Sequence, residues 1–322
     1  MNILMIPNPV VLGDLSDAHR QQILEAAGPG SRIVVARTAE DEINHAPEAD
    51  VVLGQLRRAA FVVAPKIQWL QTLAAGVDMM MFPEFVNSNI PLVSEKGIVG
   101  NQLSEHAFAL LLALTRGVAS IARRRGWIED RPAFRRHLWE LAGMTMGVVG
   151  LGGTGVAVAR RADAFGMRVI ATDPEPVEQP PFVAQLWKTD HFPQLLEESD
   201  VVTVCAPLTP ETNRMFNREA FQRMRNHAIL VNVTRGEIVD EASLIEALQG
   251  GMIGGAALDV TPREPMPADS PLWAMDNVLM ASHTAGASPH RGNRSVERFC
   301  DNLRRWRRGE PLQGVIDKHK GY

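Results

Sequence analysis

The chain has 322 residues, of which 45% are hydrophobic and 22% charged, and its formal net charge is −4. This length suggests about two domains with a sizeable core. The acidic balance argues against a general electrostatic attraction to nucleic acid or anionic membranes. The longest apolar run, "AFALLLALT" (107–115), is too short to span a bilayer and predicts a buried helix.

The two cysteines and the first residues favour a cytoplasmic protein. Cys205 and Cys300 lie in apolar and helical runs, which indicates reduced thiols rather than a disulfide framework. The start, "MNILMIPNPV", lacks the basic segment and long apolar stretch of a secretion signal.

The first hundred residues alternate between short apolar runs and helical stretches. Ser16 is the expected N-cap of a helix that ends at Gly28. The runs are apolar almost throughout, as in strands buried on both faces of a parallel sheet. The expected strands are residues 2–6, 32–36, 50–54, 69–73 and 91–95.

A long helix is expected from Gln102 to about Arg125, and a second alternating series follows a basic stretch that ends near Gly143. Asp240 caps an expected helix over 241–249, and a final helix covers 295–310. Two such series predict two doubly wound parallel α/β sheets. The strands expected in the second series are residues 146–150, 168–173, 200–206, 228–233, 255–260 and 277–282.

A glycine-rich turn between a strand and a helix predicts a dinucleotide site. Gly150, Gly152 and Gly155 fit G-x-G-x-x-G, and Asp173 ends the next strand. The glycines permit a tight turn, close approach of a pyrophosphate and close helix packing. A carboxylate at Asp173 accepts hydrogen bonds from ribose hydroxyls and repels a 2′-phosphate, so NAD is favoured over NADP. Two alternatives remain at this point: a purely structural turn, and an S-adenosylmethionine site.

Three polar side chains follow strands of the second series. Arg235, Glu264 and His283 come after the strands at 228–233, 255–260 and 277–282. Arginine grips a carboxylate with two prongs, histidine moves protons near neutral pH, and a carboxylate orients the histidine. Because ligands bind beyond the carboxyl ends of parallel strands, these groups are expected to converge near a nicotinamide and a 2-keto acid.

Several motifs, in their order along the chain, resemble those of the D-isomer-specific 2-hydroxyacid dehydrogenases. These are NAD(P)-dependent enzymes that include phosphoglycerate, glycerate and D-lactate dehydrogenases. The motifs are "VVGLGGTG", "NVTRGEIVDEASLIEAL", "GAALDV", "PLW" and "SHTAG", with "LQTLAAGVD" and "GIVGNQLSEHAFALLLAL" earlier in the chain. The resemblance covers essentially the whole chain. It implies a Rossmann nucleotide-binding domain, residues 99–286, inserted in a flavodoxin-like substrate domain, residues 1–98 plus 287–322.

The resemblance also implies residue roles. Arg235 would bind the substrate carboxylate, His283 would be the acid/base, Glu264 would pair with it, and the backbone at Ala75 and Gly76 would donate N–H groups to the substrate. A homodimer through the nucleotide domains is expected. The remaining residues expected to contact the cofactor are Gly153, Thr154, Gly155, Pro207, Thr212, Val233, Asp259 and Gly286.

The chain departs from the family pattern near its catalytic residues. Ser282 stands where proline commonly precedes the histidine, and Thr261 and Pro262 replace an aromatic residue and a glutamate. These changes bear on the shape of the pocket rather than on the chemistry. Glu264 argues against the formate-oxidising branch, which pairs its histidine with glutamine.

Other residues keep more than one interpretation. His106 is expected to be structural or interfacial, and the methionines at 79–81 fill the core or line the substrate pocket. Arg57 and Arg58 are surface charges or a second contact to the substrate anion. The scattered histidines indicate no metal site. A non-catalytic dinucleotide sensor, like the corepressors of this fold, and a methyltransferase remain as alternative functions.

Overall fold

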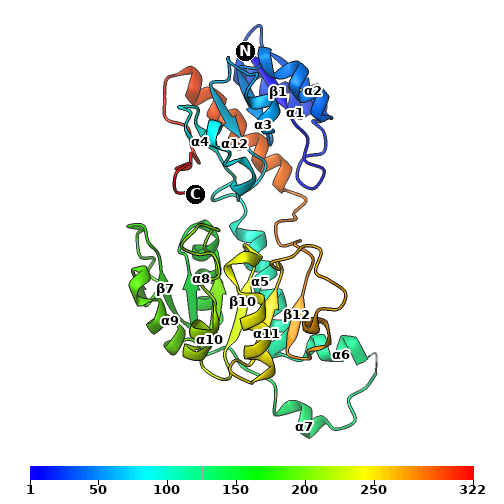
Figure 1. Cartoon of the computed structure of the whole chain (residues 1–322), viewed down its shortest axis with the longest axis vertical. Helices are drawn as coiled ribbons and strands as arrows, with labels where there is room; N and C mark the ends of the chain where they lie inside the picture. The colour runs from blue at the N-terminus through cyan, green and yellow to red at the C-terminus, as the bar shows by residue number, and fades with distance from the viewer. Residues whose placement is uncertain (125) are drawn as a thin grey trace. The chain divides into compact units, whose positions relative to one another are not determined.

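The computed structural model describes residues 1–124 and 126–322, which form two units (Figure 1). The first unit contains Met1–Val99 and Ala287–Tyr322, and the second contains Gly100–Gly286. The second unit is therefore an insertion in the chain of the first. Each unit has its own sheet and its own core on both sheet faces.

The first unit is built on a five-stranded parallel sheet in the order β2-β1-β3-β4-β5. This is the flavodoxin-like order, and all five strands lie where the apolar runs predict them. The strands are β1 (Asn2–Met5), β2 (Arg32–Val35), β3 (Val51–Leu53), β4 (Trp69–Gln71) and β5 (Leu92–Val93).

Helices cover both faces of this sheet. The apolar faces of α1 and α12 bury Ile23 and Phe299 against one face, and the short helices bury Ala60 and Phe85 against the other. The helices are α1 (Asp17–Ala27), α2 (Ala39–His45), α3 (Arg58–Phe61), α4 (Pro83–Val86) and α12 (Arg291–Arg307). The last helix begins one turn before the expected residue 295, because its polar first turn has no apolar periodicity to reveal it.

The second unit is built on a seven-stranded parallel sheet in the order β12-β11-β10-β9-β6-β7-β8. Its chain order reverses between β6 and β9, which is where doubly wound sheets bind ligands. Strand β8 was not expected; it is a short, partly exposed edge strand. The strands are β6 (Thr145–Val149), β7 (Arg168–Thr172), β8 (Gln185–Trp187), β9 (Val201–Val204), β10 (Ile229–Asn232), β11 (Gly255–Leu258) and β12 (Val278–Met280).

The helices of this unit also form two layers. One layer, α5 with α8, buries Leu111 and Val158, and the other, α9 to α11, buries Leu195 and Leu244. The helices are α5 (Gly100–Thr115), α6 (Val118–Arg124), α7 (Arg131–Arg135), α8 (Gly153–Ala164), α9 (Phe192–Glu198), α10 (Arg218–Arg223) and α11 (Glu241–Gln249).

The expectation of one long helix from Gln102 to about Arg125 is wrong. Helix α5 ends at Thr115, and α6 leaves it at an angle of 69°. Gly117 between them has φ 67°, and a Cβ there would lie 2.4 Å from the ring of Phe134. The bend therefore depends on a residue with no side chain. Arg125, the expected end, lies outside the described residues.

Among the described residues, no individual helix has the length and apolar character needed to cross a membrane; only α5 and α6 taken together, as a bent pair, meet that test.

Candidate active site

The glycine-rich turn joins β6 to α8, and its glycines differ in their surroundings. Gly150 has φ 92°, and a Cβ at Gly155 would lie 2.0 Å from the carbonyl oxygen of Gly150. An added Cβ at Gly152, in contrast, would meet no described atom within 4 Å. The turn is therefore tightly packed underneath and open at Gly152, where an anionic ligand can approach the backbone.

The amino end of α8 lies directly at this opening. Gly152 is the N-cap residue and has no side chain to hydrogen-bond the first turn, and the first helical bond runs from the Val156 N–H to the Gly152 carbonyl at 2.9 Å. The N–H groups of Gly153, Thr154 and Gly155 come before that bond. Together with the helix dipole, they suit a pyrophosphate.

Asp173 lies at the end of β7, beside the turn, and is 8% exposed. One carboxylate oxygen accepts the Leu151 N–H at 2.7 Å and the other accepts the Glu175 N–H at 2.9 Å. The carboxylate thus fixes the turn itself. Each oxygen has a second lone pair for a ribose hydroxyl, so the site fits the adenosine end of a dinucleotide.

Arg235, Glu264 and His283 follow β10, β11 and β12, which are neighbours in the sheet. All three therefore lie beyond the carboxyl edge of the same sheet that carries the glycine turn. A Cβ at Gly236 would lie 2.0 Å from the carbonyl carbon of Thr261. The loop that carries Arg235 is thus in close contact with the loop that carries Glu264.

Hydrogen bonds to the side chain of a buried strand residue, Asn232, shape the Arg235 loop. The side chain of Asn232 donates to the Arg235 carbonyl at 2.8 Å and accepts the Thr234 N–H at 3.1 Å. Arg235 itself is partly buried, and its guanidinium donates to the Thr234 carbonyl at 2.8 Å. Asn232 was missed in the sequence, although a fully buried amide at the end of an apolar strand was a usable signal.

Glu264 and His283 form a pair that reaches solvent. His283 Nδ1 lies 2.7 Å from Glu264 Oε2, and the side chains are 49% and 39% exposed. The other Glu264 oxygen accepts the Thr261 N–H at 3.2 Å. Since Nδ1 faces the carboxylate, Nε2 is the ring nitrogen that can exchange a proton with a substrate.

Asp259 fixes the His283 loop through hydrogen bonds to its backbone. Its carboxylate, 1% exposed, accepts the N–H groups of Thr284 and Ala285 at 2.9 Å each, and its carbonyl accepts the His283 N–H at 2.8 Å. His283 has φ 52°, an uncommon value for a residue with a side chain. The surrounding hydrogen bonds hold this conformation and aim the imidazole.

His106 on α5 approaches the same carboxylate. Its Nε2 lies 3.1 Å from Asp259 Oδ1, although the angle does not suit a hydrogen bond. Its contact is with a buried acid of the site framework, which agrees with the expected structural role.

Comparison with known proteins decides the family. Residues 108–285 match the family model of the D-isomer specific 2-hydroxyacid dehydrogenase, NAD binding domain. The chain is 35% identical to a glyoxylate reductase of Korarchaeum cryptofilum over 299 residues, which are 91% of this chain and 88% of that protein. The chain belongs to the D-isomer specific 2-hydroxyacid dehydrogenase family. It is accordingly an oxidoreductase, and a methyltransferase is excluded.

Other members of the family support this conclusion. A glycerate dehydrogenase of Methylorubrum extorquens is 33% identical over 79% of this chain and 80% of that protein. A D-isomer specific 2-hydroxyacid dehydrogenase of Xanthobacter autotrophicus, solved with NADPH and MES, has a TM-score of 0.81 and 28% identity, and the match covers 99% of each chain. Both sheets of the family fold are thus present here.

The other residues that the family resemblance singled out are placed as follows. Val233 is buried just after β10, and Pro207 and Thr212 lie in the loop after β9, where Thr212 Oγ1 donates to the Pro207 carbonyl at 2.7 Å. Gly286 is the last residue of the second unit. Ala75 and Gly76 belong to the first unit, in the loop after β4.

The residues with open interpretations divide clearly. Arg57 pairs with the buried Glu42, and Arg58 donates from Nε to both oxygens of Glu84 at 3.0 Å, so each arginine serves a local ion pair. Of the three methionines, Met80 is buried in the core and Met79 is exposed.

Both thiols are free. Burial raises the pKa of Cys205 to about 12 and that of Cys300 to about 11, so neither is a nucleophile at neutral pH. Within the described ranges, 1–124 and 126–322, His, Cys, Asp and Glu side chains form no group of three that suits a metal ion.

Proposed function

We propose that this family member interconverts a small 2-keto acid and its D-2-hydroxy acid with NAD(H). The observation that carries the proposal is the His283–Glu264 pair, 2.7 Å apart, at the carboxyl edge of the sheet that also bears the glycine turn and the Arg235 loop. An acid/base, its orienting carboxylate, a guanidinium and a dinucleotide turn are the groups that this reaction needs.

The nicotinamide, when bound, supplies or accepts the hydride. In the direction of reduction, His283 Nε2 donates a proton to the carbonyl oxygen of the substrate. Glu264 accepts the hydrogen of Nδ1–H and so selects the tautomer and stabilises the charged ring. Arg235 binds the substrate carboxylate with two parallel N–H bonds, which sets the face of the keto carbon that reacts.

The cofactor is proposed to be NAD rather than NADP. Asp173 is nearly buried beside the turn, so a 2′-phosphate there would be repelled by its carboxylate. The Xanthobacter relative was solved with NADPH, so this choice depends on the residues of this chain. The proposed cofactor contacts are Gly150, Gly152, Gly153, Thr154, Gly155, Asp173, Pro207, Thr212, Val233, Asp259 and Gly286.

The substrate is proposed to be a two- or three-carbon 2-keto acid. The named relatives are glyoxylate reductases and a glycerate dehydrogenase, whose substrates are of this size. The backbone N–H groups of Ala75 and Gly76 are also proposed to bind the substrate carboxylate.

The chain is proposed to act as a cytoplasmic homodimer. Three exposed apolar side chains lie on α6 or shortly after it: Val118, Ile121 and Trp127. Such residues suit an interface between copies of the chain.

A panel of 2-keto acids with NADH and NADPH tests the proposal. We expect NADH oxidation with glyoxylate or hydroxypyruvate, and a lower kcat/KM with NADPH. If the protein binds NADH tightly but reduces none of these 2-keto acids, it is a dinucleotide sensor and not an enzyme.

A further inference from the structure

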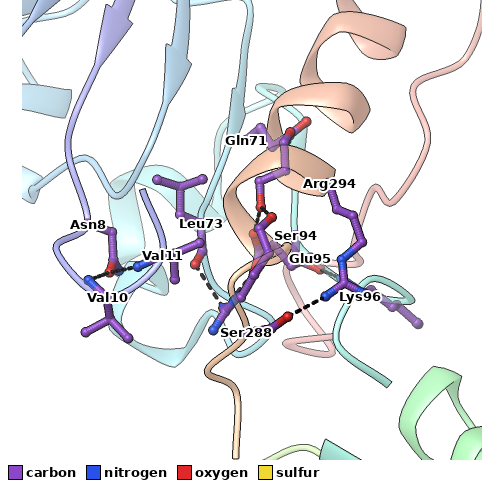
Figure 2. A network of polar contacts seen from close by, with 12 residues as sticks. Asn8, Val10, Val11, Gln71, Leu73, Ser94, Glu95, Lys96, Ser288 and Arg294 are labelled. Carbon is purple, nitrogen blue, oxygen red and sulfur yellow. Dashed lines mark hydrogen bonds and ion pairs between the residues drawn. The ribbon is translucent and has the colours of Figure 1, made fainter. Parts of the chain in front are cut away.

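A buried polar network ties α12 to the carboxyl edge of the first sheet. Glu95, just after β5, is completely buried. Its Oε2 accepts a hydrogen bond from Arg291 Nε at 2.7 Å and forms an ion pair with a terminal nitrogen of the same guanidinium at 2.6 Å. The hydroxyl of Ser295, one turn along α12, donates to Oε1. Both oxygens of the carboxylate are therefore satisfied. Figure 2 shows polar contacts in this part of the first unit, with Leu73 and Glu95 labelled.

The network also reaches the loop after β4. The guanidinium of Arg291 donates to the Leu73 carbonyl at 3.1 Å, and the Glu95 N–H donates to the Ala74 carbonyl at 3.0 Å. Earlier in the same strand pair, the Thr72 N–H donates to the Val93 carbonyl at 2.9 Å. The backbone hydrogen bonds between the β4 and β5 segments thus continue as far as Ala74, and the Arg291 side chain binds the Leu73 carbonyl beside them.

These two bonds set the direction of the next N–H group. In a trans peptide the C=O and the N–H point to opposite sides of the chain. Because the Ala74 carbonyl faces Glu95, the Ala75 N–H points away from it. Ala75 is exposed, and Val77 beyond it is buried, so the loop is held on both sides of its exposed residue.

We propose that Arg291, held by Glu95, is a positioning residue for substrate binding. Its guanidinium fixes the Leu73 carbonyl, and the Glu95 N–H fixes the Ala74 carbonyl in the next peptide plane, so that the loop of Ala75 and Gly76 is held ready for the substrate carboxylate. This inference rests on the proposed function, in which that loop binds the carboxylate. Arg291 acts through the backbone and lies 56 residues beyond Arg235 in the sequence, so no spacing motif identifies it.

The first test is Arg291→Lys, with Arg304→Lys on the same helix as the matched control. Lysine keeps a positive charge beside Glu95, but it lacks the planar guanidinium that donates to Glu95 and to the Leu73 carbonyl at the same time. We expect the KM for glyoxylate or hydroxypyruvate to rise about tenfold while kcat changes less than about twofold, since binding alone is weakened. The Kd of NADH stays unchanged. Arg304 is an exposed residue paired with Asp301 at 3.0 Å, and its replacement leaves the KM unchanged.

A second variant guards against misfolding. Glu95→Gln combined with Arg291→Met removes both buried charges together, so neither is left unpaired. The same rise in KM is expected. A folded Arg291→Lys with the wild-type KM overturns the inference, and so does an equal loss in kcat, in KM and in NADH affinity together with a lower Tm.

Hydrogen exchange separates this inference from the proposed function. Amides in residues 72–78 should exchange faster in Arg291→Lys than in the wild type, and at the wild-type rate in Arg304→Lys. If the wild type reduces no 2-keto acid, the proposed function fails, and exchange alone decides whether Arg291 fixes this loop. Unchanged exchange in Arg291→Lys overturns the positioning role whatever the turnover.

Discussion

The two units each place a carboxylate and a basic side chain together beyond their parallel strands, but the two pairs differ in burial. In the first unit, Glu95 and Arg291 have side chains that are 0% and 11% exposed. In the second, Glu264 and His283 are 39% and 49% exposed. The N–O distances are similar, 2.6 Å and 2.7 Å.

The difference in burial suits the first pair to a structural role and the second pair to proton transfer. A buried pair must satisfy every donor and acceptor, so its partners stay fixed, and removal of one partner leaves a costly unpaired charge. A half-exposed pair loses little when it opens, and its histidine can exchange protons with a ligand. The first pair therefore suits the support of a loop, and the second suits chemistry.

The largest effect is expected when the exposed pair loses its proton donor. His283→Ala should lower kcat by roughly 10²- to 10⁴-fold, because general acid catalysis is removed. The Kd of NADH and the Tm should stay close to the wild type. Steady-state rates and fluorescence titration with NADH measure both effects, with the exposed His45 on α2 replaced by alanine as the control. Normal turnover would remove His283 from the mechanism.

Matched substitutions of the two glutamates test the comparison directly. Glu95→Leu should lower the free energy of unfolding by about 3 to 5 kcal/mol, since it leaves Arg291 without its buried partner. Glu264→Leu should change the free energy of unfolding by less than about 0.5 kcal/mol, because that side chain is 39% exposed and water can solvate the group left behind. Urea unfolding of both variants gives the two values. Equal losses would show that burial does not distinguish the pairs.

Two glycines sharpen the comparison within the second unit. Gly236→Ala should lower kcat/KM by roughly 100-fold, because the new methyl group pushes the Arg235 loop away from Thr261.

In Gly152→Ala, the new methyl group meets no described atom within 4 Å, so the fold should be kept. The substitution should instead weaken NADH binding by roughly tenfold, since the methyl group occupies the space for the pyrophosphate. Similar kinetic profiles in the two variants would contradict these separate roles.

Asp200 provides a third carboxylate, with a side chain 11% exposed. Burial raises its pKa, but hydrogen bonds from the Thr145 N–H, His227 and Arg225 outweigh this, so the pKa lies below 3.8. Its contribution to stability is therefore complete above pH 3.8 and is lost as the pH falls through the lowered folded-state value.

Asp200→Asn should thus cost about 1 to 2 kcal/mol at neutral pH and almost nothing once the wild-type carboxyl is protonated. Urea midpoints of the two proteins at pH about 7 and about 2.5 measure the difference. A difference that does not shrink with acid would show that charge is not the cause.

Most of the fold could be predicted because strands buried on both faces are uniformly apolar. All the expected strands are present, and the order of both sheets agrees with doubly wound folds. Each exception has its own cause. Strand β8 is a short edge strand with little burial, and the bend at Gly117 depends on the ring of Phe134, which lies 17 positions later.

The candidate site was predictable where residues follow strand ends. Arg235, Glu264 and His283 each come directly after a strand of one sheet, so their common edge follows from topology. The His106–Asp259 contact was not predictable, because it depends on which buried polar atoms meet between the sheet and α5.

The sequence by itself determined the class of this protein, since the glycine turn, the acid at Asp173 and the strand-end residues are local patterns with a fixed period and spacing. The tertiary structure alone decided which carboxylate is fully buried and which is open, and which arginine reaches a loop more than two hundred positions earlier. The burial and the hydrogen-bond partners of these charged side chains are set by packing between distant segments, and no local pattern encodes them.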